Sequence, residues 1–117
     1  MRILILAKER TAQRLTSTLA GREFEVIAFT DPERAARLLQ KRILDLFIID
    51  SAAAGTDWVC QHKPVIGNVP IIFLVKDNEA DWARLECSNT CGFLPERANQ
   101  DELLARVGDG WRSGIRD

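Results

Sequence analysis

The chain alternates between short apolar runs and segments in which apolar residues recur every three or four positions. The apolar runs, which are typical of buried strands, cover residues 2–6, 23–29, 44–50, 70–75 and 92–94. The segments with helical periodicity cover residues 9–20, 31–42, 56–62, 79–89 and 99–111. Strands and helices that alternate five times with short connections predict an α/β fold: a five-stranded parallel sheet with five helices on its two faces.

Two details of this pattern place individual elements. Residues 44–50 are almost continuously apolar, which predicts a strand buried on both faces, whereas residues 23–29 alternate and predict a strand nearer an edge. The second helix has a marked start, because Asp31 supplies a capping carboxylate and Pro32 suits the first helical position.

The length of 117 residues is that of one domain, large enough to bury a core without disulfide or metal support. We expect this domain to span residues 1–112, followed by a tail or linker stub at 113–117. The net charge of −1 gives no general attraction to nucleic acid or to a membrane surface. The apolar run at residues 3–7 is too short for a signal peptide or a membrane span, so we expect a cytoplasmic protein.

Three cysteines, Cys60, Cys87 and Cys91, are too few for a disulfide framework and predict reduced thiols. Cys87 and Cys91 fall on the inner stripe of the helix expected at residues 79–89, which favours buried thiols. A zinc site that combines these cysteines with His62 is a weak alternative, because the spacings match no common ligand pattern. We therefore expect no metal and no cofactor.

Asp50 is the main candidate for chemistry. It ends the most apolar strand, directly before the sharp change to Ser51-Ala52-Ala53-Ala54-Gly55. Open α/β folds place their reactive groups where strands emerge at the carboxyl edge of the sheet. Asp50 can also have a purely structural role there, accepting hydrogen bonds from backbone donors in the loop.

The pattern from residue 2 to about 112 resembles the receiver domain of response regulators. The most specific segment is Leu44-Asp45-Leu46-Phe47-Ile48-Ile49-Asp50, and further matches are Val69-Pro70-Ile71-Ile72-Phe73-Leu74 and Asn89-Thr90-Cys91-Gly92-Phe93-Leu94. The resemblance implies a doubly wound, flavodoxin-like sheet with strand order 2-1-3-4-5. It also implies a bacterial two-component phosphorelay in which a histidine kinase phosphorylates the aspartate that matches Asp50.

Four positions depart from the pattern that this activity needs. The acidic pair that holds magnesium in receivers is Ala7 and Lys8 here, and neither is the hard oxygen ligand that magnesium requires. The hydroxyl residue that ends the fourth strand is Val75, and the lysine that pairs with the phosphoryl group is Glu96. Only Asp50 and the aromatic switch position, Phe93, match the family.

These departures predict a pseudo-receiver: a signalling domain that is not an enzyme and acts by protein contact without magnesium-dependent phosphorylation. One hypothesis is that Lys8 takes the place of the metal and pairs with Asp50; alternatively, Lys8 points into solvent. Glu9 is a possible but displaced metal ligand, and Glu96 can form a solvated loop with Arg97. The alternative function is an atypical receiver that is still phosphorylated on Asp50. A cofactor-binding flavodoxin-like enzyme is disfavoured, because residues 7–11 contain no glycine to bring backbone donors close to a phosphate.

The expected partner is another protein or an effector domain, or a second copy that docks through the fourth helix, fifth strand and fifth helix. Trp82 points away from the inner stripe of the fourth helix and is a possible partner contact, unless it packs against a neighbour such as Leu85. Trp58 either shields the Asp50 pocket or extends the core. Trp111 fits the inner face of the last helix.

Overall fold

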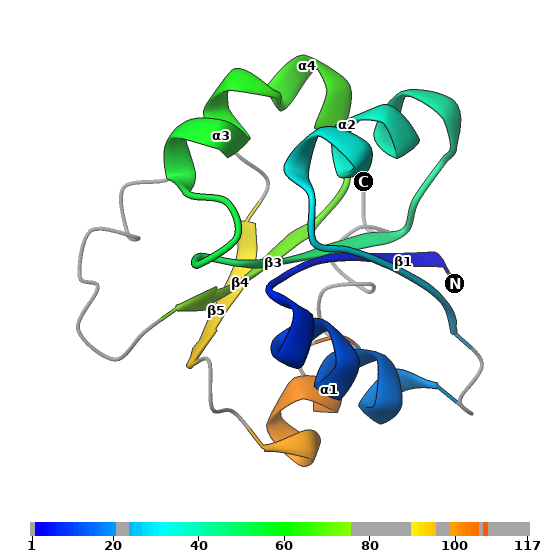
Figure 1. Cartoon of the computed structure of the whole chain (residues 1–117), viewed down its shortest axis with the longest axis vertical. Helices are drawn as coiled ribbons and strands as arrows, with labels where there is room; N and C mark the ends of the chain where they lie inside the picture. Colours follow the sequence, from blue (N-terminus) through cyan, green and yellow to red (C-terminus); the bar gives the residue numbers. More distant parts are fainter. Residues whose placement is uncertain (1, 21–23, 76–89, 96–98, 106, 108–117) are drawn as a thin grey trace.

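Five parallel strands form one sheet at the centre of the molecule (Figure 1). The structure, a computed structural model, describes residues 2–20, 24–75, 90–95, 99–105 and 107. The strands are β1 (Arg2–Leu6), β2 (Glu25–Phe29), β3 (Leu46–Asp50), β4 (Ile71–Val75) and β5 (Thr90–Pro95). Their order, β2-β1-β3-β4-β5, confirms the expected doubly wound arrangement.

The burial of each strand follows its sequence pattern. All five residues of β3 are buried, as its continuous apolar run predicts, whereas the alternating strand β2 lies at the edge and is only partly covered. In the parallel register, Leu6 of β1 pairs with Ile49, and Leu74 of β4 pairs with Asp50. The carboxyl ends of the three central strands therefore reach the same edge of the sheet.

Helices cover both faces of this sheet. They are α1 (Glu9–Leu19), α2 (Pro32–Lys41), α3 (Thr56–Gln61), α4 (Lys63–Ile66) and helical residues 100–105 and 107. Figure 1 shows α1 and the last helical residues on one face, with α2, α3 and α4 on the other. The start of α2 is as predicted: Asp31 accepts a hydrogen bond from the Glu33 amide at 3.0 Å, and Pro32 occupies the first turn.

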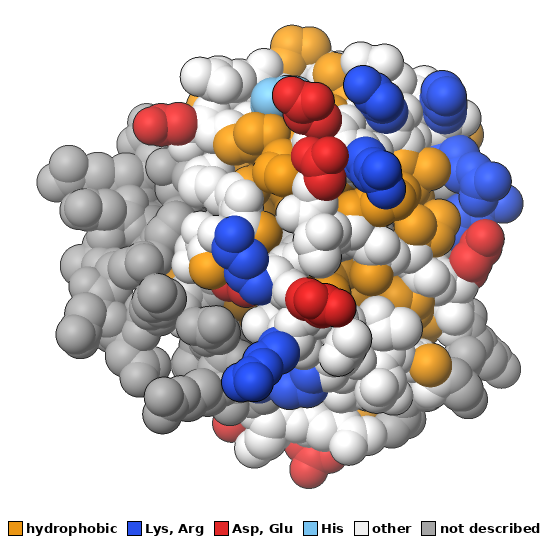
Figure 2. Space-filling view, viewed as in Figure 1, with side chains coloured by type: hydrophobic (Ala, Val, Ile, Leu, Met, Phe, Trp, Pro, Cys, Tyr) orange, Lys and Arg blue, Asp and Glu red, His pale blue; other side chains and the backbone are white. Residues whose placement is uncertain are grey.

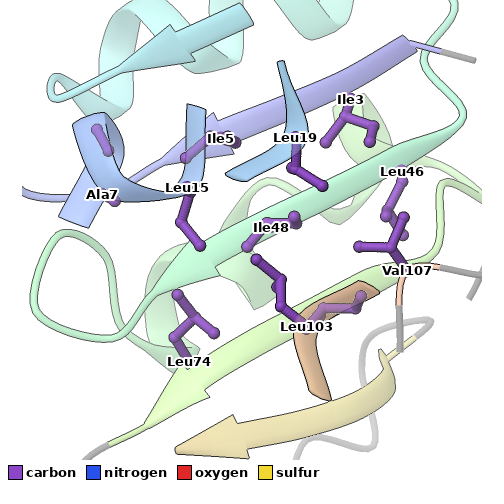
Figure 3. Packing of buried hydrophobic residues seen from close by; sticks show 12 residues of the cluster. Ile3, Ile5, Ala7, Leu15, Leu19, Leu46, Ile48, Leu74, Leu103 and Val107 are labelled. Carbon is purple, nitrogen blue, oxygen red and sulfur yellow. The ribbon is translucent and has the colours of Figure 1, made fainter. Parts of the chain in front are cut away.

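Two apolar clusters fill the layers between sheet and helices. The cluster beneath α1 contains alternate residues of each central strand together with Leu15, Leu19, Leu103 and Val107 (Figure 3). The cluster on the opposite face contains the intervening strand residues, among them Phe47 and Phe73, packed against α2, α3 and α4. Side chains point alternately to the two faces of a strand. The parity of a residue, meaning its odd or even position along the strand, therefore tells which helical layer it contacts.

Three expectations about the elements need correction or lie outside the described residues. The short helix α4 was not expected, because Pro64 is normally a signal against helix; here it lies in the first turn, where no amide donor is needed. Strand β5 begins at Thr90 rather than residue 92, with a register shift opposite Ile71 and Ile72. The helix expected at residues 79–89 lies outside the described residues.

The expectation of reduced thiols is wrong for Cys60, which forms a disulfide in this structure. That expectation rested on the small number of cysteines, which does not exclude a single disulfide; Cys60 lies on the exposed side of α3. The side chains of Cys87 and Cys91 lie outside the described part of the chain. Among the described helices, none has the length and apolarity needed to cross a membrane.

Candidate functional site

Asp50 lies at the carboxyl edge of the sheet, at the end of its central strand. It pairs in register with Leu74 on one side, and the chain that leaves β1 passes on the other side, because Leu6 pairs with Ile49. Alternation along β3 gives Asp50 the same parity as Leu46 and Ile48, which belong to the cluster beneath α1. The fold therefore places Asp50 at the carboxyl edge of the sheet, where open α/β folds bind their ligands.

The Asp50 carboxylate is buried and only partly satisfied. The residue is 1% exposed. Its Oδ1 atom accepts a hydrogen bond from the Ala52 amide at 3.1 Å, and its Oδ2 atom is buried with no hydrogen-bond partner among the described residues. The Asp50 carbonyl accepts further bonds from the amides of Ala53 and Ala54, at 2.9 and 3.2 Å. Asp50 thus shapes the turn after β3, as the structural interpretation of the sequence predicted.

An unpartnered buried carboxylate oxygen costs free energy, because water solvates an ionised carboxylate far better than an apolar interior does. The Oδ2 atom can accept a bond from a cation or from a hydrogen-bond donor. Whether magnesium fits depends on the neighbouring residues.

Ala7, the first position that the resemblance to receivers assigns to magnesium, has no side-chain oxygen that could bind a metal. Ala7 is fully buried within the apolar cluster beneath α1 and offers a methyl group instead of a carboxylate. Glu9, the only acid nearby in sequence, is exposed in the first turn of α1. Across the part of the chain that the structure describes, no three His, Cys, Asp or Glu side chains gather at one place. The described residues therefore do not fit magnesium, which prefers several hard oxygen ligands.

Lys8 does not pair with Asp50, and the hypothesis that it replaces the metal is wrong for this structure. Lys8 is exposed and occupies the position before α1, with extended backbone angles and no capping hydrogen bond from its side chain. Asp50 Oδ2 has no partner among the described residues. A lysine ammonium at the surface keeps its hydration, which it would lose beside a buried carboxylate. The alternative, a lysine in solvent, is the arrangement observed.

Val75 is half-buried at the end of β4, where receivers have a hydroxyl residue. It packs against the cluster beneath α2, α3 and α4, which is the face opposite to that of Leu46 and Ile48. Phe93 lies in β5, where its backbone pairs with Phe73, but its side chain is outside the described set. Glu96 and Trp82 also lie outside the described residues, so their predicted roles stay predictions.

Trp58 does not shield the Asp50 carboxylate. Its ring packs edge-on against Phe47, with ring centroids 6.2 Å apart and planes at 79°, and it belongs to the cluster on the face of α2, α3 and α4. His62 stacks on the same ring at 4.3 Å, and its Nδ1 atom is 2.8 Å from the Trp58 carbonyl oxygen, which accepts the bond. Sequence reasoning missed this His62 contact, although the spacing of four residues on a helix signals it.

Several solved structures of receiver domains share this architecture. The receiver domain of an HD domain-containing protein from Pseudomonas fluorescens Pf-5 matches with a TM-score of 0.87 and 18% identity, covering 99% of this chain and 97% of its own. A putative response regulator from Chloroflexus aurantiacus matches with a TM-score of 0.81 and 24% identity, covering 95% and 97%.

The receiver domain of a sensor histidine kinase from Pseudomonas aeruginosa, described with magnesium coordinated in its active-site cleft, has a TM-score of 0.80 and 17% identity, covering 95% of this chain and 97% of its own. No protein-family model and no curated protein sequence matches the chain. The structural similarity confirms the predicted fold: the chain is folded as a response-regulator receiver domain.

Proposed function

We propose that this protein is a signal-transduction domain of the pseudo-receiver kind, which acts by protein contact and without magnesium-dependent phosphorylation. The observation that carries the proposal is the state of Asp50. By the resemblance to receivers, Asp50 corresponds to the phosphoacceptor, yet it is 1% exposed, and the positions that correspond to metal ligands are Ala7, which is buried, and Lys8, which is exposed. Without metal or donor, nothing described stabilises charge on a transferred phosphoryl group.

The proposal includes four further parts that rest on the receiver fold. The protein has no enzymatic activity, it works in the cytoplasm of a bacterium, and its partner is a protein or effector domain rather than nucleic acid or a membrane. A homodimer through residues 79–89, β5 and the last helix is the arrangement that the resemblance implies, with Trp82 as a contact.

The decisive test follows the amide NMR spectrum during addition of magnesium and then beryllofluoride, a mimic of the aspartyl phosphate. We expect unchanged resonances for Asp50, Val75 and Phe93 at millimolar ligand. The matched control is Asp50→Asn, which removes the acceptor. Saturable shifts that occur in the native protein and disappear in this control would show a working pocket and contradict the proposal.

One observation favours the alternative, an atypical receiver phosphorylated on Asp50. The Oδ2 atom of Asp50 has no hydrogen-bond partner among the described residues, so its lone pairs are available to a cation or a phosphoryl group. Incubation with acetyl phosphate, followed by mass spectrometry under neutral and acidic conditions, separates the two functions. The alternative requires a phosphate adduct that acid removes and that Asp50→Asn abolishes.

A further inference from the structure

The helix α2 presents its cations on the side that faces away from the sheet. Arg34, Arg37 and Lys41 are all exposed, and their spacing of three and four residues aligns them on one stripe. The residues of α2 that are buried against the sheet are Ala35, Ala36 and Leu39. At 100° per residue, the cationic stripe lies roughly opposite this buried side. We call Arg34, Arg37 and Lys41 the cationic face of α2.

Figure 2 shows Lys and Arg side chains gathered over α2, in the upper right of the view. Of these three cations, only Arg34 forms an ion pair with a described residue: its Nε atom lies 4.0 Å from Oδ2 of Asp31, and both side chains are exposed. Arg37 and Lys41 form no ion pair with any described residue. The next cation, Arg42, lies 3.9 Å from Glu25 at the sheet edge and is not part of this face.

An exposed apolar residue follows α2 in the chain. Ile43 is 86% exposed and is the single large hydrophobic residue that is exposed among those described. It follows α2 by two positions, in the connection that leads into β3. Arg37 and Lys41, which pair with no described residue, together with Arg34 and the exposed isoleucine, match a ligand that carries carboxylates and one apolar residue.

We propose that the cationic face of α2 and Ile43 bind an acidic helical segment of a partner protein. The face extends about 10 Å along the helix axis from Arg34 to Lys41. A partner helix with Asp or Glu at i, i+3 or i+4, and i+7 repeats the same spacing, so its carboxylates meet the three cations together. This inference deepens the proposed function, since it rests on a domain that acts by protein contact and names the chemistry of the partner.

Two other kinds of ligand fit this surface less well. A membrane-bound helix inserts its apolar side into the lipid, but the apolar side of α2 is already buried against the sheet. A nucleic acid would bring phosphates close to Asp31 and Glu33 at the start of α2, in a chain whose net charge is −1.

The test uses a labelled synthetic helical peptide with glutamates at i, i+3 and i+7 and a leucine one turn beyond, and follows its fluorescence anisotropy. The control peptide carries glutamines in place of the glutamates. We expect saturable binding of the first peptide that weakens as salt is added, and at least tenfold weaker binding of the second, because about half a kcal/mol per exposed pair accumulates over three pairs.

Matched variants assign the binding to this face. Arg37→Glu together with Lys41→Glu should weaken binding about tenfold, and Ile43→Ser should weaken it several-fold with little change in salt dependence. Arg10→Glu, an equally exposed cation on α1, should leave binding unchanged. Circular dichroism of each variant confirms that the fold is retained.

Three results would overturn the inference: no binding of the glutamate peptide, an equal loss in Arg10→Glu, or tighter binding to phosphatidylserine vesicles or to duplex DNA than to the peptide. The assay contains EDTA and no phosphoryl donor, so its outcome is independent of Asp50 chemistry. Failure of the proposed function is detected separately, by the beryllofluoride titration.

Discussion

Asp50 and the cationic face of α2 place charge in opposite surroundings. Asp50 is buried, with one hydrogen bond to its Oδ1 atom and none to its Oδ2 atom, whereas Arg34, Arg37 and Lys41 are exposed and largely without counter-charge. A receiver that uses phosphoryl chemistry needs the first region to bind ions and accept a ligand. Here the buried charge lacks the neighbours that an ion site needs, and the accessible charge lies on the outer side of a helix. This difference supports the proposal that the protein recognises its partner through its surface rather than through Asp50.

The largest effect is expected from a substitution that places a second acidic side chain beside Asp50. Ala7→Asp places a second carboxylate in a fully buried position next to the end of β3. We expect the free energy of unfolding to fall by about 3 kcal/mol in EDTA, because two like charges are then buried without a partner. Urea denaturation followed by circular dichroism measures the loss.

The control for this variant is Ala7→Asn, which adds a similar volume without charge. Magnesium should restore part of the stability lost in Ala7→Asp and none of that lost in Ala7→Asn. If Ala7→Asp is as stable as the native protein in EDTA, the edge of the sheet is already open to water. Asp50 would then be as accessible to water as the cations of α2, and the two regions would not differ in burial.

A smaller effect in the opposite direction is expected from Asp50→Asn. The amide oxygen can keep the hydrogen bond from the Ala52 amide, and the substitution removes a buried charge whose second oxygen has no partner. We expect the free energy of unfolding at neutral pH to rise by about 1 kcal/mol.

Asp57→Asn is the matched control, since Asp57 is exposed in the first turn of α3 and should change stability by less than about 0.5 kcal/mol. The same urea experiment measures both variants. A loss of stability in Asp50→Asn would mean that the carboxylate is well solvated or paired in solution, contrary to its buried setting.

Sequence alone predicted the parallel sheet and the position of Asp50 at the end of a strand, because these follow from apolar periodicity and from short connections. The strand order came from the resemblance to receiver domains, and the structure confirms it. The burial of Ala7 could also be predicted from the sequence, because Ala7 extends the apolar run of β1 and therefore joins the core. What the sequence left open was side-chain direction at the ends of strands. Lys8 can point inward or outward with the same backbone, and the balance between hydration and pairing decides which occurs.

The contacts of aromatic side chains were the second feature that the sequence did not predict. From the sequence, Trp58 at the start of the third helix could either shield the Asp50 pocket or extend the core. The helix α3 instead directs its ring onto Phe47, on the opposite face of the sheet. The parity of a strand residue can be read from sequence, but the layer that a helical side chain reaches depends on how the helix is packed.

The smallest expected effect, and the closest test of the comparison, is that of Lys8→Ala. Lys8 is an exposed cation like those of α2, but it lies at the edge that contains Asp50. In the structure it has no pairing with Asp50, so the substitution should change the free energy of unfolding by less than about 0.5 kcal/mol. A double-mutant cycle with Asp50→Asn should give a coupling energy near zero, because independent sites add. A coupling above about 1 kcal/mol would mean that Lys8 reaches the buried carboxylate in solution, and the Asp50 region would then hold a paired charge rather than an isolated one.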